Sequence, residues 1–371
     1  MKIESLIIHG LHGTDRVLNI KFFDDVNIIT GSNGVGKTTV LKSVWYIISG
    51  NIERLLQEVR FESLKLVTNK YTFLIDTIIA KNNKFVFALS IKGTDGETIY
   101  TKQVTEDRLE LANEANKKVI TLSERSIYFP TFRRIEGGYT ITSNAGNTNY
   151  SKYLRNRFPI ESVLDDISKE ISVDGHKFVS SVSTKDIKSL ISQLFSEAND
   201  QSGKLTKEMI DKILTLTESR DVMAKKDSIS DFLSANESLE YISESVRIFK
   251  QRREEAFGAI NYLSDLVSTI FKHSGINFNE NLTLGCSVDA IDSDALSSGE
   301  KQMLSFLCYN MVYTNCPFFI DEPELSLHID WQRLLLSLML RQKSNNQFII
   351  ATHSPFIYTL FEDKEVIIGG N

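Results

Sequence analysis

A glycine-rich segment near the N-terminus has the residue types and spacing that bind phosphate, following the pattern G-x-x-x-x-G-K-[ST]. Its glycines would let backbone N–H groups converge on an anion. Lys37 would add a positive charge, and the Thr38 hydroxyl would ligate Mg²⁺. We therefore predict that ATP and Mg²⁺ bind at this phosphate loop, which consists of Gly31, Ser32, Asn33, Gly34, Val35, Gly36, Lys37, Thr38 and Thr39.

The flanks of the phosphate loop favour this interpretation over a chance match in a glycine-rich turn. Residues 26–30 form a short β-branched run that predicts a buried strand, and residues 39–48 have the apolar character of a buried helix. Strand, loop and helix in this order place the loop at a helix N-terminus, where the helix dipole favours anions.

Two further strand-like segments end in residues suited to phosphate chemistry. Residues 317–320 are apolar and lead into Asp321 and Glu322. Asp321 would hold Mg²⁺ through water, and Glu322 would act as the general base on the attacking water, although it could also be an ordinary exposed acid. His353 follows the apolar run 347–352, where a neutral imidazole would sense the γ-phosphate; a purely structural histidine is the alternative.

A second anion site is predicted at the start of a helix that runs through residues 303–312. Small residues at a helix N-terminus offer N–H groups to an anion, although serines there would also serve as a simple helix cap. Because the chain already has one phosphate loop, the anion here would belong to another subunit. The residues concerned are Ser297, Ser298, Gly299 and Glu300, preceded by Leu296.

Together and in this order, the three motifs resemble those of an ABC-type ATPase. In that family the segment 296–300 is the signature motif, which closes on ATP held by the partner's phosphate loop. The resemblance implies a head-to-tail homodimer with two composite ATP sites, or a higher oligomer of such dimers. It also implies catalytic roles for Glu322, His353 and Lys37.

The family branch is indicated by other segments. Three segments resemble the RecF/SMC/OLD branch, namely residues 3–11, 322–328 and 351–355. The long interval between Lys37 and Asp321 argues against the ATPase domain of a transporter. Residues 127–136 resemble a block in ATPases of bacterial anti-phage systems, including the PARIS-type ATPase subunit and relatives of OLD and Septu ATPases. One departure is that no glutamine stands near Tyr128–Arg134 to touch Mg²⁺ and water. Arg133 or Arg134 would substitute for it, or would pair with Glu136.

The predicted fold class is α/β: an ABC ATPase nucleotide lobe with a mixed sheet, and a helical lobe inserted between the phosphate loop and the signature motif. We expect the nucleotide lobe at 1–135 and 283–371 and the helical insert at 136–282. Breaks are expected near 174–175 and 200–203. Irregular heptads predict a compact insert rather than a long coiled coil.

The amino-acid composition excludes few classes of protein. The chain has 371 residues, 42% hydrophobic and 24% charged, and a formal net charge of −6. This charge does not support DNA contact, although the basic clusters at 152–157 and 247–253 leave such contact open. The second cluster is followed by Glu254 and Glu255, as is typical of a solvated helix face. No apolar run is long enough for a membrane span, and Cys286, Cys308 and Cys316 show neither zinc nor disulfide spacing. We therefore expect a cytoplasmic protein without membrane contact.

The function predicted from these observations is an ATP-hydrolysing switch of a bacterial anti-phage defence system. It would dimerise around ATP and respond to a phage-derived trigger. Because the chain ends at Asn371, soon after the final predicted strand, we expect the destructive activity on a separate effector protein, a nuclease. The alternative is a RecF/SMC-like DNA-binding ATPase clamp in DNA repair.

Overall fold

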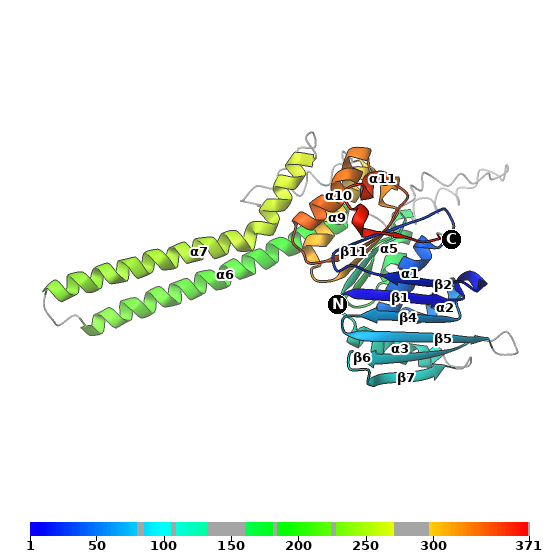
Figure 1. Ribbon diagram of the computed structural model, residues 1–371. Coiled ribbons are helices and arrows are strands. Elements are labelled where there is room, and N and C mark those ends of the chain that lie inside the picture. Colours follow the sequence, from blue (N-terminus) through cyan, green and yellow to red (C-terminus); the bar gives the residue numbers. More distant parts are fainter. Residues whose placement is uncertain are drawn as a thin grey trace, which may run out of the picture. The chain divides into compact units, whose positions relative to one another are not determined.

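The computed structural model describes residues 1–79, 85–104, 109–131, 160–180, 184–223, 228–270 and 297–369 (Figure 1). The chain divides into two compact units. The sheet unit comprises residues 1–183, 298–306 and 313–371, and the helical unit comprises residues 184–297 and 307–312. The expected domain boundaries at 135/136 and 282/283 lie outside the described residues and stay predictions.

The sheet unit contains one antiparallel sheet with the strand order β2-β1-β4-β5-β6-β7 (Figure 1). Alternating residues such as Leu6, Ile8, Leu64 and Leu66 are buried, so one face of this sheet packs into the core. The strands are β1 (Ile3–His9), β2 (Val17–Lys21), β4 (Ser63–Thr68), β5 (Tyr71–Ile79), β6 (Phe85–Gly93) and β7 (Thr98–Val104).

The second sheet of this unit is parallel at every described pairing, in the order β12-β3-β11-β10-β8-β9. Its central strands are buried along their whole length, as expected for parallel strands covered on both faces. Parallel pairing brings the carboxyl ends of β3, β10 and β11 to one edge. The strands are β3 (Val26–Thr30), β8 (Ser126–Phe129), β9 (His176–Phe178), β10 (Pro317–Asp321), β11 (Gln347–Ala351) and β12 (Glu365–Ile367).

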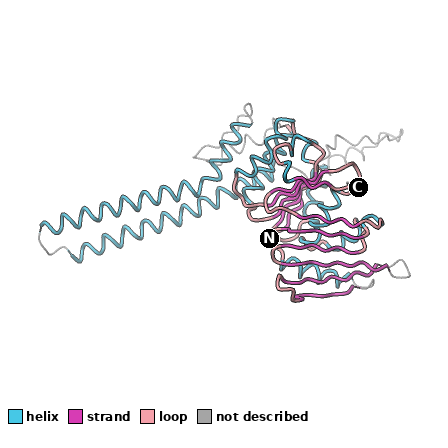
Figure 2. The backbone as a smooth tube through the Cα atoms, viewed as in Figure 1, coloured by secondary structure: helices cyan, strands magenta, loops and turns pink. Residues whose placement is uncertain are grey.

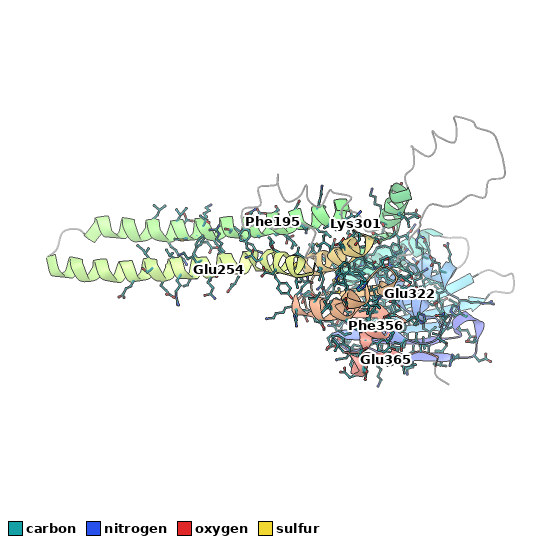
Figure 3. The ribbon with its side chains drawn as sticks, turned by 90° about the horizontal axis from the view of Figure 1, so that it is seen from above. Phe195, Glu254, Lys301, Glu322, Phe356 and Glu365 are labelled. Carbon is teal, nitrogen blue, oxygen red and sulfur yellow. The ribbon has the colours of Figure 1, made fainter. Side chains whose placement is uncertain are left out.

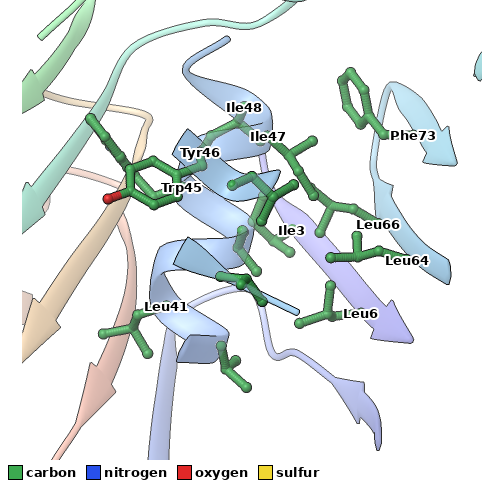
Figure 4. Packing of buried hydrophobic residues seen from close by; sticks show 14 of the residues in the cluster. Ile3, Leu6, Leu41, Trp45, Tyr46, Ile47, Ile48, Leu64, Leu66 and Phe73 are labelled. Carbon is green, nitrogen blue, oxygen red and sulfur yellow. The ribbon is translucent and has the colours of Figure 1, made fainter. Parts of the chain in front are cut away.

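Helix α1 (Lys37–Ile48) shares one core with both sheets. Its residues Leu41, Trp45 and Ile47 are fully buried, and Figure 4 shows them with Leu6, Leu64 and Phe73 of the antiparallel sheet. The other helices of the sheet unit are α2 (Ile52–Glu58), α3 (Leu109–Leu122), α5 (Ile160–Ile171), α10 (Ile329–Arg341) and α11 (Pro355–Tyr358), and α9 (Ser298–Val312) has residues in both units.

Three aromatic rings fix the edge of the parallel sheet against α1. Trp45 lies 5.5 Å from both Tyr128 of β8 and Phe178 of β9 between ring centroids, and Tyr128 stacks on Phe178 at 5.3 Å. Strand β9 follows a turn at Asp174, so the break expected near 174–175 is confirmed. Both α5 and β9 belong to the sheet unit, although the sequence placed their residues in the helical insert.

The helical unit is dominated by two long helices, α6 (Thr184–Met223) and α7 (Ser228–Ile270), of 40 and 43 residues, which pack side by side (Figures 1 and 2). Leu194 and Ala198 of α6 form a buried cluster with Ile260 of α7. The expected break at 200–203 is wrong, because α6 continues through it. A single helical glycine, Gly203, costs only about 1 kcal/mol, which packing offsets. The structure thus has two long paired helices where the sequence predicted a compact insert rather than a long coiled coil.

Candidate functional site

The phosphate loop connects the end of β3 to the start of α1. Gly31, Gly34 and Gly36 have φ values of 145°, 78° and 103°, which side chains with a Cβ rarely adopt. At Gly31 a Cβ would also lie 2.3 Å from the carbonyl oxygen of Ile368, which follows β12. The backbone conformation therefore favours glycine at all three positions, and at Gly31 close packing against the residue after β12 requires it as well.

Lys37 lies at the first position of α1, folded back over the loop. Its Nζ donates to the carbonyl oxygens of Gly31 at 3.0 Å and Ser32 at 3.1 Å, and the residue is 6% exposed. Burial lowers the pKa of Lys37, and the nearby carboxylates, Glu322 first among them, oppose that effect. The ammonium group is therefore held where an anion cradled by the loop would meet it.

Asp321 connects two other parts of the site through hydrogen bonds. It ends β10, is 2% exposed, and accepts hydrogen bonds from the hydroxyls of Thr38 at 2.9 Å and Thr131 at 2.6 Å on Oδ2. Burial raises the pKa of Asp321, and the two hydroxyls oppose the rise. Carboxylate and hydroxyl oxygens are the donors that Mg²⁺ prefers, so the residues present fit this ion. The structure brings Thr38 and Asp321 together, as the sequence predicts for the metal ligands.

Glu322, which Figure 3 labels, follows directly after Asp321. Its backbone is left-handed, with φ 49° and ψ 56°. Such a conformation costs a non-glycine residue of order 1–3 kcal/mol and is concentrated at functional sites. The Glu322 N–H donates to the carbonyl oxygen of Ala351 at 2.8 Å, which ties the turn to β11. The side chain is neither buried nor fully exposed. It therefore stands beside Asp321 at the strand edge, where a general base is predicted.

His353 is tied to the turn after Glu322 by Glu324. The Oε1 of Glu324 accepts a hydrogen bond from the His353 N–H at 2.7 Å, and its Oε2 accepts one from the Thr352 hydroxyl at 2.8 Å. His353 is exposed, whereas Thr352 is fully buried. The histidine therefore lies at the same strand edge as the phosphate loop, as the sequence predicts.

The signature motif opens α9, with Ser297 and Ser298 exposed and Glu300 in the first turn. Gly299 is buried, and a Cβ on it would lie 2.6 Å from the carbonyl oxygen of Ser326 and 3.2 Å from the Trp331 ring. The glycine is therefore needed for contact within its own chain. Its predicted role toward a partner's phosphate stays a prediction, as does that of the two serines. Leu296 lies outside the described residues.

Three residues at this edge were missed by sequence reasoning. Thr131 and Glu324 contact Asp321 and His353 as described above, and the imidazole Nε2 of His12 lies 3.4 Å from the Thr39 hydroxyl. Glu324 carried a signal, because a second acid follows Glu322 after one proline. Thr131 lies in the segment 127–136 that the resemblance singled out, but no role was assigned to it there, and His12 carried no signal.

The residues proposed to replace the missing glutamine, Arg133 and Arg134, lie outside the described residues, as do the basic cluster 152–157 and Cys286. The basic cluster 247–253 lies in α7, where Arg247 pairs with Glu244 at 2.7 Å on an exposed face. This pairing agrees with the interpretation of that cluster as a solvated helix face.

Comparison with known families decides the class. The model of the AAA ATPase domain matches residues 1–358. The chain belongs to this family. The expected ATPase class is therefore confirmed. Among the described residues, no helix is long and apolar enough to cross a membrane.

Two curated relatives add to the AAA ATPase assignment. The Retron Vc95 probable ATPase of Vibrio cholerae serotype O1 biovar El Tor is 22% identical over 393 residues, which cover 93% of this chain and 68% of the relative. The Septu protein PtuA of Bacillus thuringiensis is 38% identical over 77 residues, 20% of this chain and 19% of PtuA. The chain is thus an ATPase related to components of a retron and of Septu.

Solved structures that match the chain include two Smc head domains. The Smc head bound to the C-winged helix domain of ScpA matches with a TM-score of 0.39 and 13% identity, over 97% of this chain and 91% of that chain. A head with an extended coiled coil, bound to the C-terminal domain of ScpA derived from Pyrococcus furiosus, matches with a TM-score of 0.36 and 15% identity, over 96% and 91%.

Proposed function

We propose that this AAA ATPase is a nucleotide-driven switch of a bacterial anti-phage defence system. It binds ATP and Mg²⁺ on the phosphate loop, dimerises head to tail around them, and controls a separate effector, a nuclease, in response to a phage-derived trigger. The observation that carries the proposal is the hydrogen bond from the Thr38 hydroxyl to Asp321 at 2.9 Å. It joins the phosphate loop to the acidic end of β10, as a Mg²⁺-dependent nucleotide site requires.

The residues take distinct roles in this proposal. Lys37 provides a countercharge for the phosphates, while Thr38 and Asp321 hold Mg²⁺, which would neutralise charge on the phosphate oxygens. Glu322 takes a proton from the attacking water, and His353 senses the γ-phosphate. The hydrogen bonds of Glu324 support the last two roles, because they connect the turn after Glu322 to the His353 backbone.

Dimerisation is supported by the exposed serines of the signature motif. Ser297 and Ser298 stand at the N-terminus of a helix of 15 residues, where backbone N–H groups favour an anion. The phosphate loop of the same chain supplies one nucleotide site of its own. Two copies related by a two-fold axis would therefore form two composite sites.

The defence assignment is supported by the relatives, which are named for a retron and for Septu. The test is purification of the chain from its native host with whatever it binds, followed by identification of the bound proteins. We expect a nuclease in that complex. The purified chain alone, with Mg²⁺ and DNA or RNA, is expected to cut neither. Robust cleavage by the chain alone, abolished by substitution of an acid in α6 or α7, would overturn the separate effector.

A RecF/SMC-like clamp on DNA is the second candidate, favoured by the long paired helices α6 and α7. The two candidates differ in what stimulates ATP turnover. A clamp in DNA repair would hydrolyse ATP faster when DNA ends or gaps are added. The defence switch is expected to show no such stimulation, and an increase of tenfold or more with DNA would favour the clamp.

A further inference from the structure

Thr131 contacts the acidic end of β10 from just beyond the end of β8, outside the nucleotide motifs. Its hydroxyl donates to Oδ2 of Asp321 at 2.6 Å, the same oxygen that accepts the Thr38 hydroxyl at 2.9 Å. Asp321 is 2% exposed. A buried carboxylate needs partners, and here both are threonine hydroxyls, one at the start of α1 and one just after β8.

The position of Thr131 is fixed by the sheet. Strand β8 pairs in parallel with β10, with Ile127 opposite Phe318 and Phe129 opposite Ile320. Pro130 then ends the strand, since it has no N–H for a further ladder bond. Phe129 is anchored by an edge-to-face contact with Phe306 of α9, 4.8 Å between ring centroids. Thr131 is therefore delivered to the level of Asp321 by a buried strand rather than by a free loop.

The sequence supplies a reason for a hydroxyl at this position. No glutamine stands in the segment 127–136, where the resemblance to ABC-type ATPases expects one that touches Mg²⁺ and water. A threonine hydroxyl is a shorter group with a related capacity, because it both donates and accepts hydrogen bonds. It could keep its donation to Asp321 while its lone pairs accept from a metal-bound water.

We propose that Thr131 is a positioning residue for nucleotide-bound Mg²⁺, acting in place of the absent glutamine. It orients the Asp321 carboxylate and accepts a hydrogen bond from water on the metal. The inference rests on the proposed nucleotide site, since it assigns a further residue to that site. Thr131 touches the metal ligand and not the phosphates, so it contributes to affinity only when Mg²⁺ is present.

A simpler role would be to neutralise the buried Asp321 charge without regard to Mg²⁺. The two roles differ in a measurable way. Loss of a merely structural hydroxyl would weaken nucleotide binding equally with and without the metal. Loss of a metal-positioning hydroxyl would weaken it only with the metal.

The test measures the Kd of the full-length chain for a non-hydrolysable ATP analogue, in Mg²⁺ and in EDTA. Thr131→Val removes the hydroxyl at nearly constant volume, and Thr131→Ser keeps it. Thr101→Val is the matched control, because Thr101 is exposed on β7 in the antiparallel sheet. Melting temperatures of all variants show whether each is folded, and Thr131→Ala replaces the valine variant if that variant does not fold.

The expected result for Thr131→Val is a Kd about tenfold higher in Mg²⁺, as for loss of a hydrogen bond to a charged group, and unchanged in EDTA. Thr131→Ser and Thr101→Val should match the wild type within about twofold in both conditions. Equal weakening in Mg²⁺ and EDTA, or no weakening in Mg²⁺, would overturn the role of Thr131. A wild-type chain whose analogue binding ignores Mg²⁺ would instead overturn the proposed nucleotide site, and this inference with it.

Discussion

The backbone N–H of His353 donates to the carboxylate of Glu324 at 2.7 Å. The second oxygen of that carboxylate accepts the hydroxyl of Thr352, and the Glu324 carbonyl accepts from the Gln332 amide at 3.3 Å. Glu324 stands two residues after Glu322, in a 3₁₀ turn that begins at Pro323. One side chain therefore fixes the spacing between the predicted general base and the predicted phosphate sensor.

We expect Glu324→Gln to lower ATP turnover at least tenfold while changing nucleotide affinity less than twofold. Glutamine replaces one of the two carboxylate oxygens with an NH₂ donor, so either the His353 N–H or the Thr352 hydroxyl loses its present acceptor. The measurement is steady-state ATPase kinetics together with equilibrium binding of a non-hydrolysable ATP analogue. Glu97→Gln, on an exposed turn of the antiparallel sheet, is the control. If Glu324→Gln hydrolyses ATP at the wild-type rate, Glu324 does not couple Glu322 to His353.

Lys37→Ala and Glu322→Gln should separate binding from hydrolysis. Without the Lys37 ammonium, the phosphates lose a countercharge, so we expect nucleotide affinity to fall at least tenfold. With glutamine at position 322, affinity should stay within about twofold, but turnover should fall at least a hundredfold, since an amide cannot take the proton from water. Binding is measured by calorimetry and turnover by phosphate release. Full turnover by Glu322→Gln would exclude this residue as the base.

How much of the site the sequence predicts depends on whether its residues are close along the chain. Lys37 and Thr38 share one loop with its glycines, and Asp321 and Glu322 share one strand end, so local patterns identify them. Thr131 and Asp321 are 190 positions apart in the sequence, and Thr131 reaches Asp321 only because β8 pairs with β10. No local pattern records such a pairing.

The composite site is tested best at Ser298 rather than at Gly299. A side chain at Gly299 would collide with the Ser326 carbonyl of the same chain, so its substitution would disturb folding as well as dimer closure. Ser298 is exposed at the start of α9. Ser298→Glu favours the helix N-terminus but repels a partner's phosphate, whereas Ser298→Ala adds no charge.

We expect Ser298→Glu to keep the wild-type melting temperature and monomer affinity for nucleotide, and to lose at least tenfold in turnover. Ser298→Ala should lose less than threefold. Mixing Ser298→Glu with Lys37→Ala chains should restore at most one composite site in each mixed dimer. If Ser298→Glu hydrolyses ATP as fast as Ser298→Ala, the signature motif does not act on a partner's nucleotide.

The buried His176 predicts a pH dependence of folding stability. His176 lies in β9, is 1% exposed, and shares a hydrogen bond of 2.7 Å with the Ser126 hydroxyl. Burial lowers the pKa of His176 to about 4, against about 6.5 in the unfolded chain. Between these values the unfolded state binds more protons, so stability falls as the pH decreases from 6.5 toward 4.

The expected loss is about 3 kcal/mol of unfolding free energy across that pH range, for this residue alone. His176→Asn should remove that part of the pH dependence while keeping a polar partner for Ser126. His9→Asn, at an exposed position of β1, should leave it unchanged. Denaturant unfolding at a series of pH values measures the difference. An equally steep profile in His176→Asn would show that another group titrates.

The helical unit shows where sequence patterns mislead. The polar segment at 200–203 has the composition of a loop, yet α6 continues through it. Asp200, Gln201 and Gly203 are exposed, so their polarity suits a helix surface as well as a loop. The apolar contacts that stabilise the helix come from Leu194 and Ala198 against Ile260 on the other helix. Such contacts depend on pairing between helices, which the irregular heptads did not indicate.

The central claim, an ATPase that closes into a dimer around bound nucleotide, is tested most directly by the mass of Glu322→Gln in solution. Light scattering is measured for this variant with Mg²⁺ and ATP, with Mg²⁺ alone, and for Lys37→Ala with Mg²⁺ and ATP. We predict that the mass of Glu322→Gln doubles only when ATP is present, because the nucleotide stays uncleaved between the subunits, and that Lys37→Ala does not change. An unchanged mass of Glu322→Gln with ATP bound would contradict the account.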